Sequence, residues 1–283
     1  MITTDIFVQE HLPVIGSAAD KFSRGHLLVA AGSYGMAGAA ILCIRAAYAS
    51  GVGYVTAMMP KEIYPIVTAA VPEAVCLPYE SENTADFAEK FAQAEEHCNA
   101  AVFGPGIGKF RAQAAHVVFE KTRRPLLVDA DGLNALSEMD RLQFASTDIV
   151  LTPHEGEAGR LLKKDRLWVH ENRAEAVRML SAGFNAAALL KGPKTLVFDA
   201  RTGNMAENPT GCEALARAGS GDVLSGLIGG LMAQGVKGYD AAVMGAYLHG
   251  LAGEYCKETI GVRGTMPGDV IRALAEVFRR LGK

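Results

Sequence analysis

The stretch AAVFGPGIGKFRAQAAHVVFEKTRRPLLVDADG, residues 100–132, indicates the fold of this protein. It starts with an apolar run that ends in glycines, continues through an amphipathic run, and closes with an apolar run that ends in aspartates. Two short apolar runs joined by a helical pattern are typical of a unit with two parallel strands and a helix packed on one face. The same alternation continues in both directions along the chain.

Seven apolar runs are predicted to be strands: residues 26–32, 53–59, 100–106, 125–132, 148–154, 186–192 and 195–199. Helices are predicted at residues 36–50, 84–97, 110–123, 156–163 and 171–182, followed by three more at roughly 221–235, 238–257 and 267–281. Near-continuous apolar strands are buried on both faces, so this order predicts an α/β fold with a central, mostly parallel sheet and helices on both faces. No linker or repeat divides the chain, and residues 1–283 are predicted to form a single domain.

The composition excludes several classes of protein. A formal net charge of −3 without a stripe of lysines and arginines argues against nucleic acid as a partner. The apolar stretch from Ala37 to Met59 is interrupted by Arg45 and by glycines, which argues against a membrane span. Five widely spaced cysteines favour a reduced, cytoplasmic location without structural zinc or disulfides. Any anionic ligand must therefore be held by local groups.

Polar residues and glycines gather at the carboxyl ends of the predicted strands: Gly32-Ser33, Gly104-Pro105-Gly106, Asp129 and Asp131, Thr152-Pro153-His154, and Lys191-Gly192-Pro193. Ligands of open parallel sheets bind at this edge. We therefore expect Gly106, Asp131, His154, Lys191 and Asp222 to line one crevice, although they are far apart in the sequence.

The stretch AGSGDVLSGLIGGLMAQG, residues 218–235, places a glycine-rich turn directly before an apolar helix. The free amides of such a turn, together with the helix dipole, favour a bound anion. Asp222 would repel that anion, unless a bound phosphoryl group must be attacked by a hydroxyl that needs a general base. The helix end is expected to keep Asp222 ionised and to stabilise charge on the transferred group. The alternative is a tight connection in which Asp222 only complements the dipole.

Two further motifs have both a structural and a functional interpretation. KGPKT, residues 191–195, joins two strands, either as a hairpin with an exposed lysine or as a contact to a nucleotide. TPHEGEAGRL, residues 152–161, places His154 and Glu157 at a helix start, as a cap and a first-turn acid. If phosphoryl transfer takes place, His154 instead contacts the substrate and Glu157 orients Mg²⁺ through water. The remaining histidines share no metal-binding spacing and are interpreted as structural: His11, His26, His97, His116, His170 and His249.

Together, these segments resemble the NAD(P)H-hydrate dehydratase family of the ribokinase-like superfamily, over about residues 10–280. The resemblance is carried, in order, by GSYGMAGAAIL…ASGVGYV, FGPGIG, VDADGLNAL, LTPHEGEAGRL, LLKGPKTLV, NPTG and AGSGDVLSGLIGGLMAQG. It implies a ribokinase-like fold with three C-terminal helices, and a dehydratase domain without the epimerase domain that some members carry. The implied reaction is nucleotide repair: ADP or ATP phosphorylates the hydroxyl of the S epimer of hydrated NADH or NADPH, and phosphate is then eliminated. Mg²⁺ as a cofactor and a homo-oligomer, with a tetramer favoured, are implied as well.

The resemblance also implies roles for individual residues. Asp222 is the catalytic base, and the hydrated nucleotide is contacted by Ala39, Gly106, His154 and Asp222. The AMP part of the donor is contacted by Lys191, Gly192, Pro193, Lys194, Thr195 and Gly221, and the anion hole is formed by Gly219, Ser220 and Gly221. Glu157 falls at the glutamate of the magnesium-orienting NxxE motif of related kinases. The chain departs from the family pattern at Ser220, where threonine is usual, and at Cys212-Glu213-Ala214, which weakens any assignment of those three residues to the site.

Two other functions compete with this one. A kinase of the same superfamily, acting on a vitamin precursor such as hydroxyethylthiazole or hydroxymethylpyrimidine, would share Asp222 and the anion hole. TPHEGE followed by KGPKT favours the dehydratase. A non-catalytic nucleotide sensor is the second alternative, and Asp222 argues against it, because a sensor has no use for a base beside the phosphate. The sequence leaves open the preference between NADH and NADPH hydrates, and the choice of ADP over ATP follows from the resemblance alone.

Overall fold

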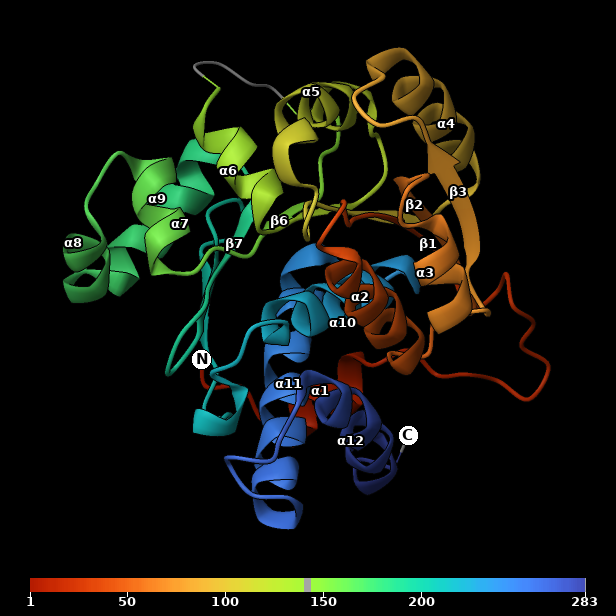
Figure 1. Ribbon diagram of the computed structural model, residues 1–283. Coiled ribbons are helices and arrows are strands. Elements are labelled where there is room, and N and C mark those ends of the chain that lie inside the picture. The colour runs from red at the N-terminus through yellow and green to blue at the C-terminus, as the bar shows by residue number, and fades with distance from the viewer. Residues whose placement is uncertain (140–143, 283) are drawn as a thin grey trace.

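The structure, a computed structural model, describes residues 1–139 and 144–282. Its centre is a nine-stranded sheet (Figure 1). The strands are β1 (His26–Ala30), β2 (Tyr54–Pro60), β3 (Val75–Tyr79), β4 (Ala100–Phe103), β5 (Leu126–Val128), β6 (Ile149–Leu151), β7 (Ala187–Leu190), β8 (Leu196–Asp199) and β9 (Asn204–Glu207). Their order is β3-β2-β1-β4-β5-β6-β7-β8-β9. All neighbours from β3 to β7 pair in parallel, and β8 and β9 are added antiparallel at one edge.

Helices cover both faces of the sheet (Figure 1). One face carries α1 (Asp5–His11), α2 (Ala37–Ala49), α3 (Tyr64–Ala70), α10 (Ser220–Ala233), α11 (Gly238–Thr259) and α12 (Pro267–Arg280). The other face carries α4 (Thr84–His97), α5 (Arg111–Lys121), α6 (Asp131–Ser137), α7 (Glu155–Leu162), α8 (Arg166–Glu171) and α9 (Arg173–Phe184). Short 3₁₀ turns lie at Gly108–Phe110 and Glu213–Leu215.

Strand β1 shows why the sequence forms this sheet. All five of its residues are buried, and the four after His26 alternate between two apolar cores. Leu27 and Val29 pack into the core under α2 and α10, whereas Leu28 and Ala30 pack into the core under α4 and α5. A strand covered on both faces needs an apolar residue at every position, which is the pattern in the sequence. The predicted mostly parallel sheet with helices on both faces and three C-terminal helices is confirmed.

The structure contains elements that the sequence pattern did not predict, and their physical reasons differ. Strand β3 contains Pro78, a residue that sheets tolerate at edges. Strand β9 is short and partly polar, and it forms the other edge. The predicted strand at residues 125–132 is too long, because β5 ends at Val128 and α6 already begins at Asp131. Four helices of the described residues were also missed, α1, α3, α6 and α8, each of seven residues or fewer.

Helix α10 packs beside α2 and on β4 of the sheet, and its glycines allow very close contact with both. A Cβ atom on Gly226 would lie 2.0 Å from the backbone oxygen of Cys43 in α2. A Cβ atom on Gly229 would lie 2.2 Å from Cγ2 of Val102 in β4. Any larger residue would therefore push the helix out of its place. In the part of the chain that the structure describes, no helix is long and apolar enough to cross a membrane.

Candidate active site

The structure brings the residues predicted from the sequence to the carboxyl edge of the parallel strands. A Cβ atom on Gly106 would lie 2.9 Å from Cβ of Ala39, so these two predicted substrate contacts are direct neighbours. The backbone N–H of Gly108 donates to the carboxylate of Asp131 at 2.9 Å, which ties the loop after β4 to the start of α6. Segments from several strands therefore meet at this edge.

A buried ion pair forms the centre of the site. Lys191 Nζ donates to Asp129 Oδ1 at 2.8 Å and lies 3.8 Å from Glu157 Oε2. Asp129 also accepts from Ser225 Oγ of α10 at 2.6 Å. Burial by itself disfavours both charges, but the pairing outweighs it: the pKa of Asp129 is lowered and that of Lys191 is raised. The hairpin expected at residues 191–195 is confirmed, but Lys191 is not its exposed lysine, since only 20% of its side chain is exposed.

The first turn of α10 presents backbone donors and a carboxylate side by side. Gly219 precedes the helix in a left-handed conformation, with a φ of 91°. Within residues 1–139 and 144–282, the backbone N–H groups of Gly221 and Asp222 find no acceptor. Such free amides are what an anion hole requires. A Cβ atom on Gly221 would lie 3.5 Å from Lys191 Nζ, which places this turn next to the ion pair.

The environment of Asp222 moves its titration toward neutral pH. Burial raises its pKa to about 6, and the nearby carboxylate of Asp129 adds to the effect, while Lys191 opposes it. At pH 7 the carboxylate is therefore still mostly ionised, which is the state that the sequence-based expectation gives it. A carboxylate whose pKa lies closer to neutrality is a stronger base than an ordinary aspartate.

His154 and Glu157 form the helix cap that the structural interpretation predicts. His154 Nδ1 accepts from the backbone N–H of Gly156 at 2.9 Å, and Glu157 Oε2 accepts from the backbone N–H of His154 at 2.8 Å. Burial lowers the pKa of His154, and the charges of Lys191 and Arg160 lower it further. The ring is therefore neutral with its proton on Nε2, which lies 3.5 Å from Glu157 Oε1. The side chain of His154 is exposed, so this nitrogen remains able to donate to a ligand.

The described residues fit a magnesium ion that arrives with a nucleotide better than a resident one. Among residues 1–139 and 144–282 there is no cluster of three or more side chains that could ligate a metal. Asp129 is already engaged by Lys191, and burial raises the pKa of Glu157. Magnesium bound with nucleotides keeps several waters and needs only one or two carboxylates. A contact from Glu157 through water is compatible with this arrangement.

Sequence reasoning missed two residues that support the site. Arg173 donates to Glu155 Oε1 at 2.8 Å and to the backbone oxygens of Leu190 and Lys191 at 3.2 and 3.4 Å, so it braces the turn at residues 191–195. His249, interpreted as structural, lies with Nε2 3.3 Å from Ser220 Oγ. Neither has a local sequence signal, because their partners are contributed by other elements.

Among the residues that the structure describes, no hydrogen bond or ion pair joins Cys212-Glu213-Ala214 to the predicted site residues. Glu213 forms an ion pair with Lys257 of α11 at 2.9 Å, and Ala214 is buried. These contacts agree with the departure of this segment from the family pattern.

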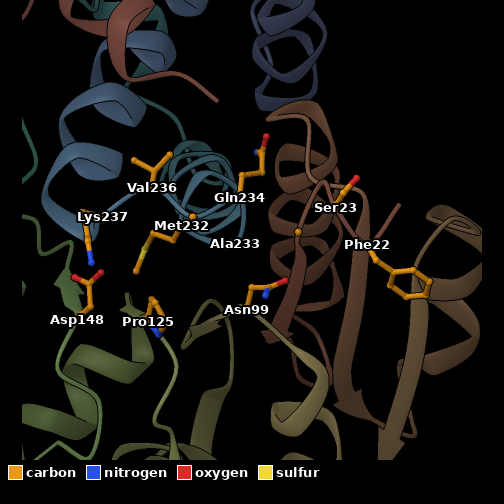
Figure 2. A pocket seen from close by; sticks show the side chains of 12 residues that line it. Phe22, Ser23, Asn99, Pro125, Asp148, Met232, Ala233, Gln234, Val236 and Lys237 are labelled. Carbon is orange, nitrogen blue, oxygen red and sulfur yellow. The ribbon is translucent and has the colours of Figure 1, made fainter. Parts of the chain in front are cut away.

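A cavity of about 330 Å³ lies at the opposite, amino-terminal edge of the sheet (Figure 2). Asn99, Pro125 and Asp148, which directly precede β4, β5 and β6, line it together with the C-terminal end of α10 and Lys237. None of the predicted site residues lines this cavity. It is therefore separate from the ion pair and from Asp222.

Comparison with known proteins agrees with the geometry. A family model described as NAD(P)H-hydrate dehydratase matches residues 27–276. The chain is 39% identical over 271 residues to the ADP-dependent (S)-NAD(P)H-hydrate dehydratase of Neisseria meningitidis, covering 93% of this chain and 88% of that protein. It spans about half the length of the bifunctional NAD(P)H-hydrate repair enzymes that it also matches.

Solved structures share the fold over nearly the whole chain. The ADP/ATP-dependent NAD(P)H-hydrate dehydratase of Bacillus subtilis, co-crystallised with ATP and Mg²⁺, superposes with a TM-score of 0.88 at 28% identity, covering 99% of this chain and 98% of that one. A ribokinase-like superfamily protein from Enterococcus faecalis superposes with a TM-score of 0.86 at 22% identity, covering 99% and 95% of the two chains, and shows the fold alone. The family match and the relative from Neisseria carry the conclusion: this chain belongs to the NAD(P)H-hydrate dehydratase family.

Proposed function

We propose that this protein restores NADH or NADPH from the S epimer of its hydrate, with ADP as the phosphoryl donor. One observation carries the chemistry: Asp222, with a pKa raised to about 6, stands beside two backbone N–H groups that have no acceptor in the described part of the chain. A base next to an anion hole suits an attack on phosphorus, and family membership supplies the substrate.

In the proposed reaction, Asp222 accepts the proton of the hydrate hydroxyl as its oxygen attacks the terminal phosphorus of the donor. The bond from phosphorus to the leaving nucleotide oxygen breaks, and the amides of Gly221 and Asp222 stabilise the charge on the moving phosphoryl group. The carbon–oxygen bond of the phosphorylated hydrate then breaks. Loss of phosphate from this carbon and of a proton from its neighbour restores the double bond of the reduced ring.

We assign the two substrates to different parts of the edge. The hydrated nucleotide is proposed to contact Ala39, Gly106, His154 and Asp222. The donor is proposed to contact Gly221 and the turn at residues 191–195, whose middle residues are exposed and therefore accessible. We place the anion hole at the turn formed by Gly219, Ser220 and Gly221. The N–H of Ser220 already donates to the carbonyl of Arg217 at 3.2 Å, so the proposed donors are the amides of Gly221 and Asp222.

Further parts of the proposal follow the family resemblance. Mg²⁺, when bound, would neutralise charge on the donor phosphates, and Glu157 would hold it through water. ADP as the donor agrees with the ADP dependence of the relative from Neisseria, while the relative from Bacillus depends on ADP or ATP. A homotetramer and a cytoplasmic location stay predictions.

Incubation with the S epimer of hydrated NADH and either ADP or ATP tests the function. We expect the absorbance of reduced nicotinamide to return with ADP, and AMP and inorganic phosphate to accumulate in step with it. A stable phosphorylated product would indicate a kinase instead. Nucleotide binding without any turnover of the hydrate would indicate a sensor.

A further inference from the structure

A buried histidine of α11 contacts the residue with which α10 begins. His249 and Ser220 are both 8% exposed, and Nε2 of the histidine lies 3.3 Å from Oγ of the serine. The serine stands directly before Gly221 and Asp222, whose amides have no acceptor among residues 1–139 and 144–282. The histidine is therefore connected to the anion hole through a single side chain, that of Ser220.

The imidazole is neutral at physiological pH. Burial lowers the pKa of His249 to about 4, and the positive charge of Lys191 acts in the same direction, while a hydrogen bond to the backbone of Ser220 opposes them. A neutral imidazole carries one N–H, so its contact with the serine hydroxyl can run in either direction. With the proton on Nε2, the nitrogen that faces Ser220 Oγ, the ring is the donor in this contact.

This assignment decides what the serine hydroxyl can do. With Nε2–H donating to it, Oγ is an acceptor on the histidine side, and its own proton is left for another partner. In the described part of the chain, this hydroxyl contacts His249 alone. Its proton is therefore available toward the turn at which the amides of Gly221 and Asp222 are open.

We propose that His249 is a positioning residue, which holds the Ser220 hydroxyl so that it donates to the bound phosphoryl group as a third donor beside the two amides. The inference rests on the proposed function, because it takes a phosphoryl group to be transferred at this helix end. In this role His249 does not itself transfer a proton. A purely structural histidine would fill the space between α10 and α11 without affecting the transferred group.

A double-mutant cycle tests the proposal with hydrated NADH and ADP. Ser220→Ala is expected to lower kcat about 100-fold, as loss of one donor to a developing anion does. We expect His249→Leu to lower kcat about tenfold with the KM for the hydrate unchanged, and to have no further effect in the Ser220→Ala background. His249→Gln, which keeps an N–H, should recover most of the loss. Equal losses from His249→Leu in both backgrounds, or no recovery with glutamine, would overturn the proposal.

The chain offers a matched control pair at the other edge of the sheet. His26 Nε2 lies 2.8 Å from Thr56 Oγ1, and both residues are about as buried as the proposed pair. His26→Leu is expected to lower stability as His249→Leu does but to leave kcat within about twofold, which is the scatter expected for a change outside the site. A fall in kcat equal to that of His249→Leu would mean that the loss reflects only a looser fold.

Two readouts keep the proposal testable if a variant does not fold or the hydrate is not the substrate. Nitrogen NMR of the wild-type protein should show His249 neutral and protonated on Nε2 from pH 5 to 8. Protonation on Nδ1 instead would overturn the inference, regardless of the kinetics of the variants. If the wild type does not turn over the hydrate, the proposed function fails by itself. The affinity of each single variant and of the double variant for ADP is then measured by calorimetry. Losses of affinity that are not additive support the positioning role of His249, and additive losses reject it.

Discussion

At the scale of single residues, Asp222 combines a favourable position for chemistry with an unfavourable one for stability. Burial of its carboxylate and the negative charge of the nearby Asp129 together raise its pKa to about 6. A group whose pKa is raised on folding is harder to ionise in the folded protein than in the unfolded one. Ionised Asp222 therefore costs stability, and this cost appears as the pH rises from about 4 to about 6.

Asp222→Asn is expected to separate the two roles. Loss of the base should lower kcat by about 10²–10⁴-fold, while the affinity for ADP holds or improves because a negative charge has left the anion site. From the sequence alone, a small loss of stability is expected. The structure reverses the sign: at pH 7 the variant should be more stable by about 1–3 kcal/mol. Urea unfolding at pH 7 and pH 4 measures this, and equal differences at both pH values would contradict it.

The pH dependence of the reaction should report the same carboxylate. Because the base is active only when ionised, kcat/KM should fall below pH 6, by about tenfold for each further pH unit. The Asn variant should show no such limb in its residual activity. An acid limb centred near pH 4 in the wild type would indicate that another group is being titrated.

Lys191 is expected to contribute to stability as well as to donor binding. Lys191→Met leaves Asp129 buried without its partner, which typically costs about 3–5 kcal/mol. Asp129→Asn in the same chain should recover most of that cost, and the double variant should show a KM raised more for ADP than for the hydrate. Lys194→Met, at an exposed position of the same turn, is the control and should change stability by less than about 0.5 kcal/mol. No recovery in the double variant would argue against the ion pair as the cause.

At the scale of elements, α10 connects the site to the core, and its glycines determine how closely it packs. Gly226→Ala is expected to destabilise the protein by about 1–3 kcal/mol, because its methyl group would meet the Cys43 carbonyl. Gly183→Ala in α9 is the matched control: nothing lies within 4 Å of its Cβ position, so the better helix propensity of alanine should stabilise by up to about 1 kcal/mol. Both values follow from denaturant unfolding. A harmless Gly226→Ala would mean that α2 and α10 can move apart.

The elements that the sequence predicts well are those that repeat a simple pattern. Continuous apolar runs predict β1, β4 and β7, since both faces of these strands are covered. The edge strands β3 and β9 escape the pattern, because edges tolerate proline and polar residues. Residues next to the turns, such as Asp131, are assigned to strands although they already belong to the following helix. Local pattern therefore predicts the middle of an element better than its ends.

At the scale of the whole molecule, parallel topology makes the location of the site predictable, while its contacts are not. Once the strands are known to be parallel, their carboxyl ends must share an edge. The contact from Lys191 to Asp129 joins residues 62 positions apart, and that from Ser225 joins residues 96 apart. Such pairs depend on which strands become neighbours and how α10 is seated, and neither is encoded in a local pattern. His249 is missed for the same reason.

The separation of the two sheet edges leads to a prediction of its own. Lys237 lines the cavity at the amino-terminal edge, whereas Lys191 is at the carboxyl edge. Lys237→Ala should leave kcat and both KM values within about twofold, the scatter expected for a distant site. Steady-state kinetics with hydrated NADH and ADP checks this. A large effect on the KM for either substrate would show that the reaction also uses the opposite edge.

The packing of α10 against α2 and the sheet has a consequence for synthesis on the ribosome. Residues 37–49 of α2 emerge long before residues 220–233 of α10, so the nascent chain carries an open apolar groove over β1 and β4 until α10 arrives. Exposed grooves of this kind attract chaperones and favour aggregation. A chain released early would contain Lys191 and Asp129 but neither the base nor the anion hole. The base and the anion hole are thus added to the site by the same step that packs α10 against α2 and the sheet.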